Sequence, residues 1–249
     1  MATEGNASFL RHEAYVYIKE QLVAGRWGLN DRISEKTVAD ELGISRTPVR
    51  EAIRKMIIEG LVYQVPSSGT FVTKPDRQSI VEMFEVRMAL ESLAASKATE
   101  LIRAPEVREM QRHFTVMRNA SRAFRDTGDK YMSGEILERF LVADRAMHTL
   151  LLSISDNRLA SNIVQNGRIQ SLIYGLSTYE RDLHHIAATL RAHGRILLAI
   201  KQRDTELASY WMENHVRNSM RDALLAYDRH VTAENRKSPE NLARKAGRE

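Results

Sequence analysis

The chain has 249 residues and contains no cysteine, which excludes disulfides, thiolate metal sites and cysteine nucleophiles. Its formal net charge is +5 at pH 7, which allows a nucleic-acid partner without requiring one. Glycine (12) and proline (5) are scarce, so the composition favours helices over sandwiches, barrels and disorder. The length suits one large domain or two ordinary ones.

The sequence shows neither the pattern of a secretory leader nor that of a membrane-spanning helix. Residues 1–10 lack both the basic lead and the apolar stretch of a secretory leader. The longest helix-like apolar run, at 196–200, is far below the roughly 18 residues that a membrane span needs. We therefore expect a cytoplasmic protein with no membrane partner.

Two short helices flank a glycine turn in the N-terminal part. The first is expected over 35–42, where Ser34 precedes it as the N-cap. The second is expected over 45–59, with Ser45 as its N-cap. Gly43 ends the first helix and supplies the tight turn between them. This arrangement is typical of a helix-turn-helix.

The flanking segments complete a winged form of that motif. An amphipathic helix is expected over 8–24, before the helix pair. After the pair, residues 61–65 and 70–73 have the pattern of two strands, and 66–69 that of the turn joining them. We therefore expect a winged helix-turn-helix DNA-binding domain over residues 1–75.

The second helix of the pair carries an exposed basic face. Its exposed residues include Arg46, Thr47, Arg50 and Arg54, and the three arginines are spaced at about one turn. Arginine forks suit phosphate oxygens and guanine edges. Such a helix is expected to enter the major groove. The other interpretation is that these side chains are only solvated surface charges. The serine cap, glycine turn and wing favour the DNA-binding interpretation.

The same region resembles a known family. The resemblance is carried by Ile33-Ser34-Glu35, Leu42-Gly43-Ile44, Ser45-Arg46-Thr47-Pro48-Val49-Arg50-Glu51-Ala52-Ile53, Leu61-Val62 and Gly69-Thr70-Phe71-Val72. These motifs look like the DNA-binding domain of the GntR transcription regulators. The resemblance implies that Arg46, Thr47 and Arg50 contact DNA and that Gly69, at the wing tip, reaches the minor groove. Lys36 stands where other members carry a DNA-contacting arginine.

Residues 76–231 contain one proline and have the pattern of an all-helical bundle. Helices are expected over about 76–103, 105–126, 130–155, 156–176, 180–203 and 204–231. The short connections between them favour antiparallel neighbours. Residues 232–249 are polar and are expected to form a disordered tail.

Polar side chains recur on the inward faces of these helices. Asp144 and His148 are four residues apart, so both project from one helix face. His193 and His215 follow on later helices, each among apolar neighbours. Three imidazoles and one carboxylate suit Zn, Ni, Cu, Mn or Fe better than Ca or Mg. Spacing alone does not join the four, and each histidine could instead be an ordinary core residue.

A second resemblance joins them. It is carried by Phe84-Glu85-Val86-Arg87, Leu90-Glu91, Asp144, His148, His193, Ile196-Leu197, Ala199-Ile200, Asp204, Ala208 and His215. Residues 80–231 look like the FCD-type ligand-binding domain of the FadR-like branch of GntR regulators. This implies an effector-binding and dimerisation domain in which Asp144, His148, His193 and His215 hold a divalent metal. Zinc is the first candidate for that metal, with Ni, Mn and Fe as the others. The likeness also implies that Arg87 binds the effector; the other interpretation is a surface ion pair with Glu91.

Together the two parts predict a ligand-responsive, sequence-specific transcription regulator that is not an enzyme. The resemblance implies a repressor, a homodimer on palindromic double-stranded operator DNA, and a small carboxylate effector bound beside the metal. Two other functions stay open. The Asp/His₃ set could serve a metal-dependent hydrolytic enzyme, or the protein could bind DNA constitutively without an effector.

Overall fold

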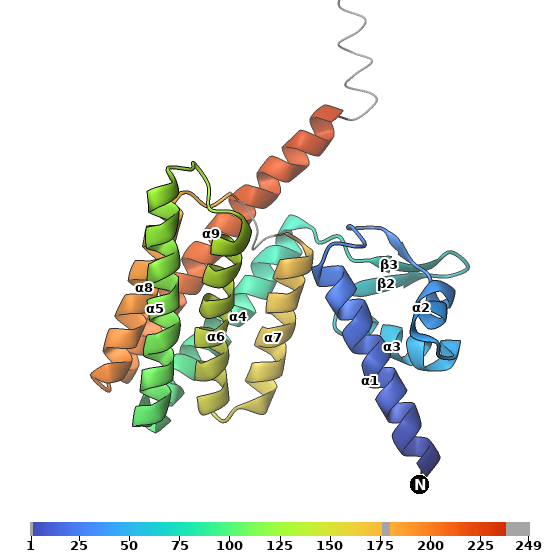
Figure 1. Cartoon of the computed structure of the whole chain (residues 1–249), viewed down its shortest axis with the longest axis horizontal. Coiled ribbons are helices and arrows are strands. Elements are labelled where there is room, and N and C mark those ends of the chain that lie inside the picture. Colours follow the sequence, from blue (N-terminus) through green and yellow to red (C-terminus); the bar gives the residue numbers. More distant parts are fainter. Residues whose placement is uncertain (1, 176–179, 238–249) are drawn as a thin grey trace, which may run out of the picture. The chain divides into compact units, whose positions relative to one another are not determined.

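The computed structural model describes residues 2–175 and 180–237 (Figure 1). The chain divides into two compact units. The first, here called the head, comprises Met1–Asp76 with Arg168–Ser177. The second, here called the helical unit, comprises Arg77–Gly167 with Thr178–Glu249. The end of the expected tail, residues 238–249, lies outside the described residues, as does the expected break at Ser177 and Thr178.

The head is a winged helix-turn-helix, as the sequence predicted. Its elements are α1 (Ala2–Val23), β1 (Arg32–Ile33), α2 (Glu35–Leu42), α3 (Arg46–Ile58), β2 (Val62–Val65) and β3 (Gly69–Val72). The Ser34 hydroxyl accepts a hydrogen bond from the Thr37 amide at 3.2 Å and caps α2. Gly43 ends α2 in the left-handed conformation, with φ of 65°. This conformation costs glycine little, so it makes the tight turn into α3.

The wing contains one strand more than the expected hairpin. The three strands are antiparallel in the order β1-β3-β2, and β1 pairs Arg32 with Phe71 and Ile33 with Thr70. Two residues are too few to give an alternating sequence pattern, which is why β1 escaped the sequence analysis. Beneath the sheet and helices, the head has its own core, in which Ile18, Val49 and Met56 are fully buried.

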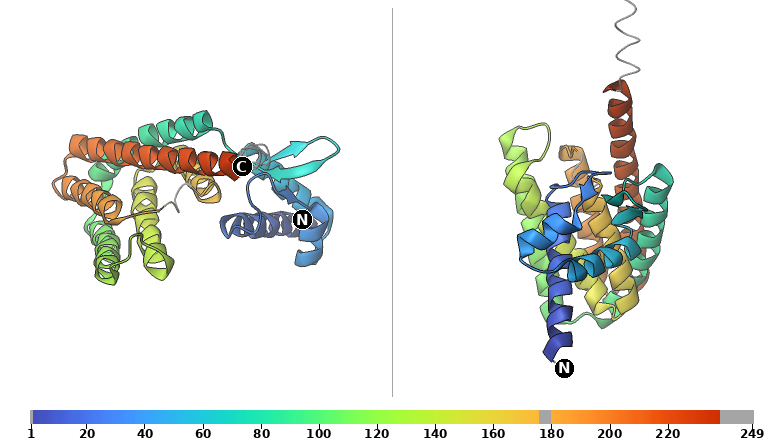
Figure 2. Two further views of the ribbon diagram at one scale, coloured as in Figure 1. Left: turned by 90° about the horizontal axis from the view of Figure 1, so that it is seen from above. Right: turned by 90° about the vertical axis from the view of Figure 1, so that its right-hand side faces the viewer.

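The helical unit is the expected all-α bundle. Its helices are α4 (Arg77–Leu101), α5 (Ala104–Thr127), α6 (Gly134–Ile154), α7 (Arg158–Ile173), α8 (Leu183–Lys201) and α9 (Thr205–Lys237). Figure 2 shows α4 and α9 side by side along much of their length, and α5 packs against both α6 and α8. In the described part of the chain, no helix is both long and apolar enough to cross a membrane.

Two helix limits in this unit differ from the sequence expectation by more than three residues. α6 begins at Gly134, after Ser133, and not at about residue 130. At the other end of the unit, α9 continues to Lys237, so residues 232–237 of the expected tail are helical. The sequence analysis missed this part of the helix, because residues 232–237 lack an apolar stripe of helical period.

One segment groups with the head although the sequence analysis assigned it to the helical domain. Gln170 donates a hydrogen bond to the Glu59 carbonyl at 2.9 Å, and the Tyr174 hydroxyl donates to the Gly60 carbonyl at 3.3 Å. Ile169 packs against the head's apolar core, as does Ile173. Burial of these apolar side chains on the core explains why 168–177 belongs to the head.

Candidate metal centre and DNA-binding surface

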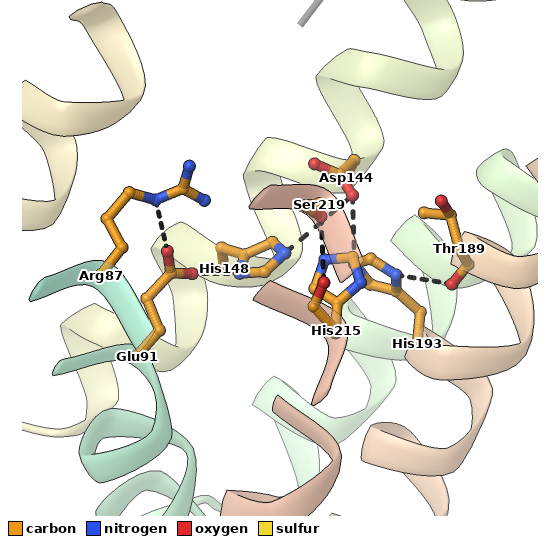
Figure 3. Close-up of polar contacts among 8 residues, drawn as sticks. All are labelled: Arg87, Glu91, Asp144, His148, Thr189, His193, His215 and Ser219. Carbon is orange, nitrogen blue, oxygen red and sulfur yellow. Dashed lines mark hydrogen bonds and ion pairs between the residues drawn. The ribbon is translucent and has the colours of Figure 1, made fainter. Parts of the chain in front are cut away.

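Four side chains from three helices converge inside the helical unit (Figure 3). Asp144 and His148 come from α6, His193 from α8 and His215 from α9. One candidate ligand atom from each lies within 4.8 Å of the others. The three imidazoles are buried, while the Asp144 side chain keeps 18% of its surface exposed. The structure thus brings together all four residues that the sequence suggested as metal ligands.

Hydrogen bonds orient two of these imidazoles. His193 Nδ1 lies 3.0 Å from the Thr189 carbonyl oxygen, which can only accept, so Nδ1 carries the proton. Its Nε2 then presents a lone pair to the cluster, where Asp144 Oδ1 is 3.2 Å away. His148 Nδ1 lies 2.5 Å from Glu91 Oε2, and its Nε2 faces the same Asp144 oxygen at 4.0 Å. Both rings therefore turn Nε2 inward.

The third imidazole, that of His215, is uncharged in this environment. Burial lowers the pKa of His215 well below its ordinary value, and the neighbouring His193 and His148 lower it further. The His193 and His215 ring centroids are 4.4 Å apart, and those of His148 and His215 are 5.1 Å apart. Neutral imidazole is the form that binds a metal.

The donor set fits a divalent transition metal. Ligands bonded to one tetrahedral zinc ion at about 2.1 Å lie about 3.4 Å apart, so atoms that lie within 4.8 Å of one another need close by at most about 1.4 Å, a shift that side-chain rotation can supply. His193 Nε2 is buried and makes no hydrogen bond of good geometry to any described residue. Such a polar atom is costly to bury without a ligand. A shared metal would satisfy it together with the neighbouring donors.

The adjacent pair His184 and His185 does not form a comparable cluster. Their ring planes are 89° apart, and His185 is hydrogen-bonded to the Asp182 carboxylate at 2.7 Å. Among the described residues, the Asp144 cluster is the group that satisfies the geometry for a metal. Neighbouring histidines on a helix point in different directions, so the two rings do not share a ligand easily.

Arg87 lies on α4 and its ion pair with Glu91 is present, but buried. Nε of Arg87 is 2.9 Å from Glu91 Oε1, and 8% and 1% of the two side chains are exposed. This pair was expected on the surface as the alternative to effector binding. The structure places the pair inside the unit instead, where Glu91 also contacts His148 of the metal cluster (Figure 3). In the sequence analysis Glu91 was part of a motif and the possible surface partner of Arg87, with no role at the metal site.

On the head, a groove of about 510 Å³ lies between α2, the start of α3 and the wing. It is lined by four of the residues proposed to bind DNA, namely Lys36, Arg46, Arg50 and Gly69. Arg54 lies in a different groove, beside Arg11 of α1. Thr47 is exposed at the start of α3. The structure therefore separates Arg54 from the other basic residues with which the sequence grouped it.

One carboxylate holds two of the groove arginines. Glu35 Oε2 lies 3.1 Å from Arg50 Nη2 and 3.3 Å from Arg46 Nη2. The Glu35 side chain is only 16% exposed, whereas Arg46 and Arg50 are more than half exposed. Both guanidinium groups are thus gathered at one point of the groove. Sequence reasoning missed Glu35, because pairs 11 and 15 residues apart on different helices leave no local pattern.

A winged helix-turn-helix joined to a helical unit with a polar, metal-competent centre is typical of ligand-responsive transcription regulators. The sequence pattern of the bacterial regulatory proteins of the gntR family matches residues 10–72, and that of the FCD domain matches residues 82–218. The chain belongs to the GntR family of transcription regulators and carries an FCD domain.

Relatives in other bacteria extend along most of the chain. The transcriptional regulator YdhC of Bacillus subtilis is 24% identical over 203 residues, which cover 81% of this chain and 85% of that protein. The transcriptional repressor RspR of Escherichia coli is 26% identical over 187 residues, covering 74% and 75%. A probable D-xylose utilization operon repressor of Paenarthrobacter nicotinovorans is 25% identical over 201 residues, covering 80% and 82%. These relatives are transcription regulators, and two of them are named as repressors.

Solved structures share the fold. McbR/YncC of E. coli superposes with a TM-score of 0.71 at 18% identity, covering 88% of this chain and 98% of that one. A GntR regulator from Rhodococcus sp. RHA1 gives a TM-score of 0.66 at 18% identity, covering 87% and 98%. At this identity the likeness concerns the fold alone.

Proposed function

We propose that this regulator is a homodimeric repressor that leaves a palindromic operator when a small carboxylate metabolite binds beside a divalent metal in its FCD domain. The observation that carries the proposal is the convergence of inward-facing imidazole Nε2 atoms and the Asp144 carboxylate in a buried cluster. Zinc is the first candidate for the metal, with Ni, Mn and Fe next.

In this proposal, different residues bind the metal, the effector and the DNA. Asp144, His148, His193 and His215 would hold the metal, which when bound supplies a positive charge for a carboxylate. Arg87 would be the second anchor, since guanidinium recognises carboxylate. On the head, Lys36, Arg46, Thr47 and Arg50 would contact DNA, with Gly69 at the wing. Arg54 would contribute only through its charge, because it lines another groove.

Metal analysis tests the helical unit. We expect about one equivalent of metal in the purified full-length protein and a loss of it in His193→Ala. His184→Ala is the matched control, since His184 is an exposed histidine on the same helix α8. A wild-type protein that takes up no Zn²⁺, Ni²⁺, Mn²⁺ or Fe²⁺ would contradict the metal site. Stoichiometric metal would in turn argue against a constitutive DNA-binding protein.

DNA titration tests the head. Fluorescence anisotropy with the protein's own promoter should show at least a tenfold loss of affinity in Arg50→Ala, since a bidentate base contact contributes about 1–3 kcal/mol. Arg54→Ala should lose much less, and its loss should be similar for random DNA. His193→Ala should retain operator binding. Equal affinity of the wild type for promoter and random DNA at physiological salt would refute the regulator, and would return the hydrolytic enzyme to consideration.

A further inference from the structure

We propose that Glu91 is a positioning residue of the metal site, which fixes His148 as a ligand and is itself fixed by Arg87. This inference rests on the metal binding proposed above. It adds a residue from a fourth helix, α4, to a centre whose candidate ligands come from α6, α8 and α9. The three side chains form a chain of contacts from Arg87 to the cluster (Figure 3).

The two oxygens of Glu91 are divided between two partners. Oε1 accepts from Arg87 Nε at 2.9 Å, and Oε2 lies 2.5 Å from His148 Nδ1. The Glu91 and His148 side chains are each only 1% exposed. A buried carboxylate so close to an imidazole nitrogen orients the ring strongly, because water cannot compete for either group.

The two ring nitrogens of His148 face different partners. Nδ1 contacts the Glu91 carboxylate, and Nε2 faces Asp144 and the rest of the cluster. A carboxylate accepts hydrogen bonds, so Glu91 favours the tautomer with the proton on Nδ1 and the lone pair on Nε2. A carboxylate on the far nitrogen of a metal-binding histidine fixes its tautomer and raises its basicity.

The position of Arg87 is itself held by packing. Its guanidinium lies over the Phe84 ring at 4.8 Å. Gly167 of α7 brings backbone close to the Arg87 stem: a Cβ at position 167 would lie 3.4 Å from Arg87 Cδ and 3.3 Å from Met83 Cγ. The chain of contacts thus begins at a side chain that α4 and α7 both constrain. Any anion that engages Arg87 is linked to the metal ligand through one intervening carboxylate.

The test is zinc affinity, measured by competition with a fluorescent chelator on full-length protein. Glu91→Ala should weaken Zn²⁺ binding about 10- to 100-fold, the range found for such outer partners of metal ligands. Glu85→Ala, an exposed carboxylate on the same helix, is the matched control and should bind zinc as the wild type does. The Co²⁺-loaded Glu91→Ala protein should also show a changed visible absorption spectrum, whereas Glu85→Ala should not.

A double-mutant comparison separates positioning from general support of the fold. In a His148→Ala background, Glu91→Ala should cause no further loss of zinc affinity, because the residue through which it acts is gone. An equal loss in both backgrounds would overturn the proposal. Since removing Glu91 takes an ion-pair partner from the buried Arg87, the series is repeated as Glu91→Gln in an Arg87→Met background, with thermal melts to confirm folding.

The outcomes distinguish this inference from the function on which it rests. Wild-type zinc affinity in Glu91→Ala, with zinc bound by the wild type, overturns the role of Glu91 and leaves the metal site standing. Failure of the wild type to bind Zn²⁺ or Co²⁺ overturns the metal site and this inference together.

Discussion

At the scale of single residues, Glu35 controls how the head presents its arginines. It is a mostly buried carboxylate that contacts both Arg46 and Arg50 at the groove. Its negative charge opposes phosphate, while its hydrogen bonds restrict two long, flexible side chains. The two effects act in opposite directions: the first lowers affinity for any DNA, and the second favours the sequence that fits the fixed arginines.

Glu35→Gln should therefore reduce the discrimination between operator and random DNA. We expect binding to random DNA to tighten by about fivefold, equivalent to about 1 kcal/mol, and operator binding to tighten less or to weaken. Anisotropy titrations with operator and random duplexes at one salt concentration give the ratio. Glu51→Gln is the control, since Glu51 pairs with Arg11 outside this groove. An unchanged ratio would show that Glu35 does not order the arginines.

Sequence analysis identified the candidate metal ligands that form a local spacing pattern or belong to a recognisable motif. Asp144 and His148 were visible from their spacing, and His193 and His215 from their apolar neighbours. Resemblance joined the four into one predicted site. Glu91 and Glu35 were missed as functional residues, because each acts through a contact between elements. Glu91 lies 57 residues from His148, and its spacing from Arg87 indicated only a local ion pair. Such contacts depend on how helices pack, which periodicity does not specify.

At the scale of elements, the wing depends on the backbone of Gly69. Its φ is 120°, outside the conformations that residues with a side chain adopt easily. A Cβ at this position would also lie 2.7 Å from Arg32 Nε of β1. Gly69→Ala should cost about 1–3 kcal/mol of stability and weaken operator binding, since the backbone of the wing is strained and the Arg32 side chain has to move. Thermal melts and DNA titrations measure the two effects.

Gly43→Ala is the comparison for that prediction. Gly43 also has a positive φ, of 65°, but a Cβ there would meet nothing within 4 Å. It should cost only about 1 kcal/mol, from the left-handed backbone alone. Equal costs at the two positions would mean that contact with Arg32 is unimportant for the wing.

Tyr174, which follows α7 directly in the segment that groups with the head, should make the stability of the protein depend on pH. Burial raises the pKa of Tyr174 to about 12, against about 10 in an unfolded chain. The folded state thus binds the phenolic proton more tightly. The resulting stability is complete below pH 10 and is lost as the pH rises towards 12. At pH 11 the loss is about 1.4 kcal/mol, because one pKa unit has then been crossed.

Tyr174→Phe isolates this effect. At pH 9 the variant should be less stable by about 1 kcal/mol, because the hydrogen bond to the Gly60 carbonyl is removed. At pH 11 the difference should vanish or reverse. Denaturant midpoints at the two pH values give the comparison, which cancels the titration of groups common to both proteins. A constant difference would show that Tyr174 is not buried in solution.

Prediction from sequence succeeded for elements bounded by strong local signals. Ser34 and Gly43 define α2, and Asp204 accepts a hydrogen bond from the Leu207 amide at the start of α9. It failed for β1, which is two residues long, and for the last turns of α9. The grouping of 168–177 with the head also escaped it, because Ile169 and Ile173 fit the apolar pattern of any bundle helix.

At the scale of the whole molecule, the candidate metal site and the helix-turn-helix lie in units with separate cores. The head buries Met56 in a core formed with Ile18 and Leu61, and the helical unit buries Met117 and Phe140. The metal cluster lies entirely within the helical unit. A ligand that binds one unit stabilises that unit by mass action and acts on the other only through coupling between them.

Calorimetry of the full-length protein should therefore resolve two unfolding transitions, of which Zn²⁺ raises only one. At a free concentration of about 100 times Kd, zinc should stabilise the helical unit by about 2.7 kcal/mol. Two matched substitutions of fully buried methionines assign the transitions. Met56→Ala should destabilise the head, and Met117→Ala the unit that responds to zinc. Each should lower the free energy of unfolding by about 2–5 kcal/mol. In His193→Ala the zinc response should disappear while both transitions persist. A single transition lowered alike by both methionine variants would instead mean that the two units unfold as one, so that zinc bound in the helical unit would stabilise the DNA-reading head directly.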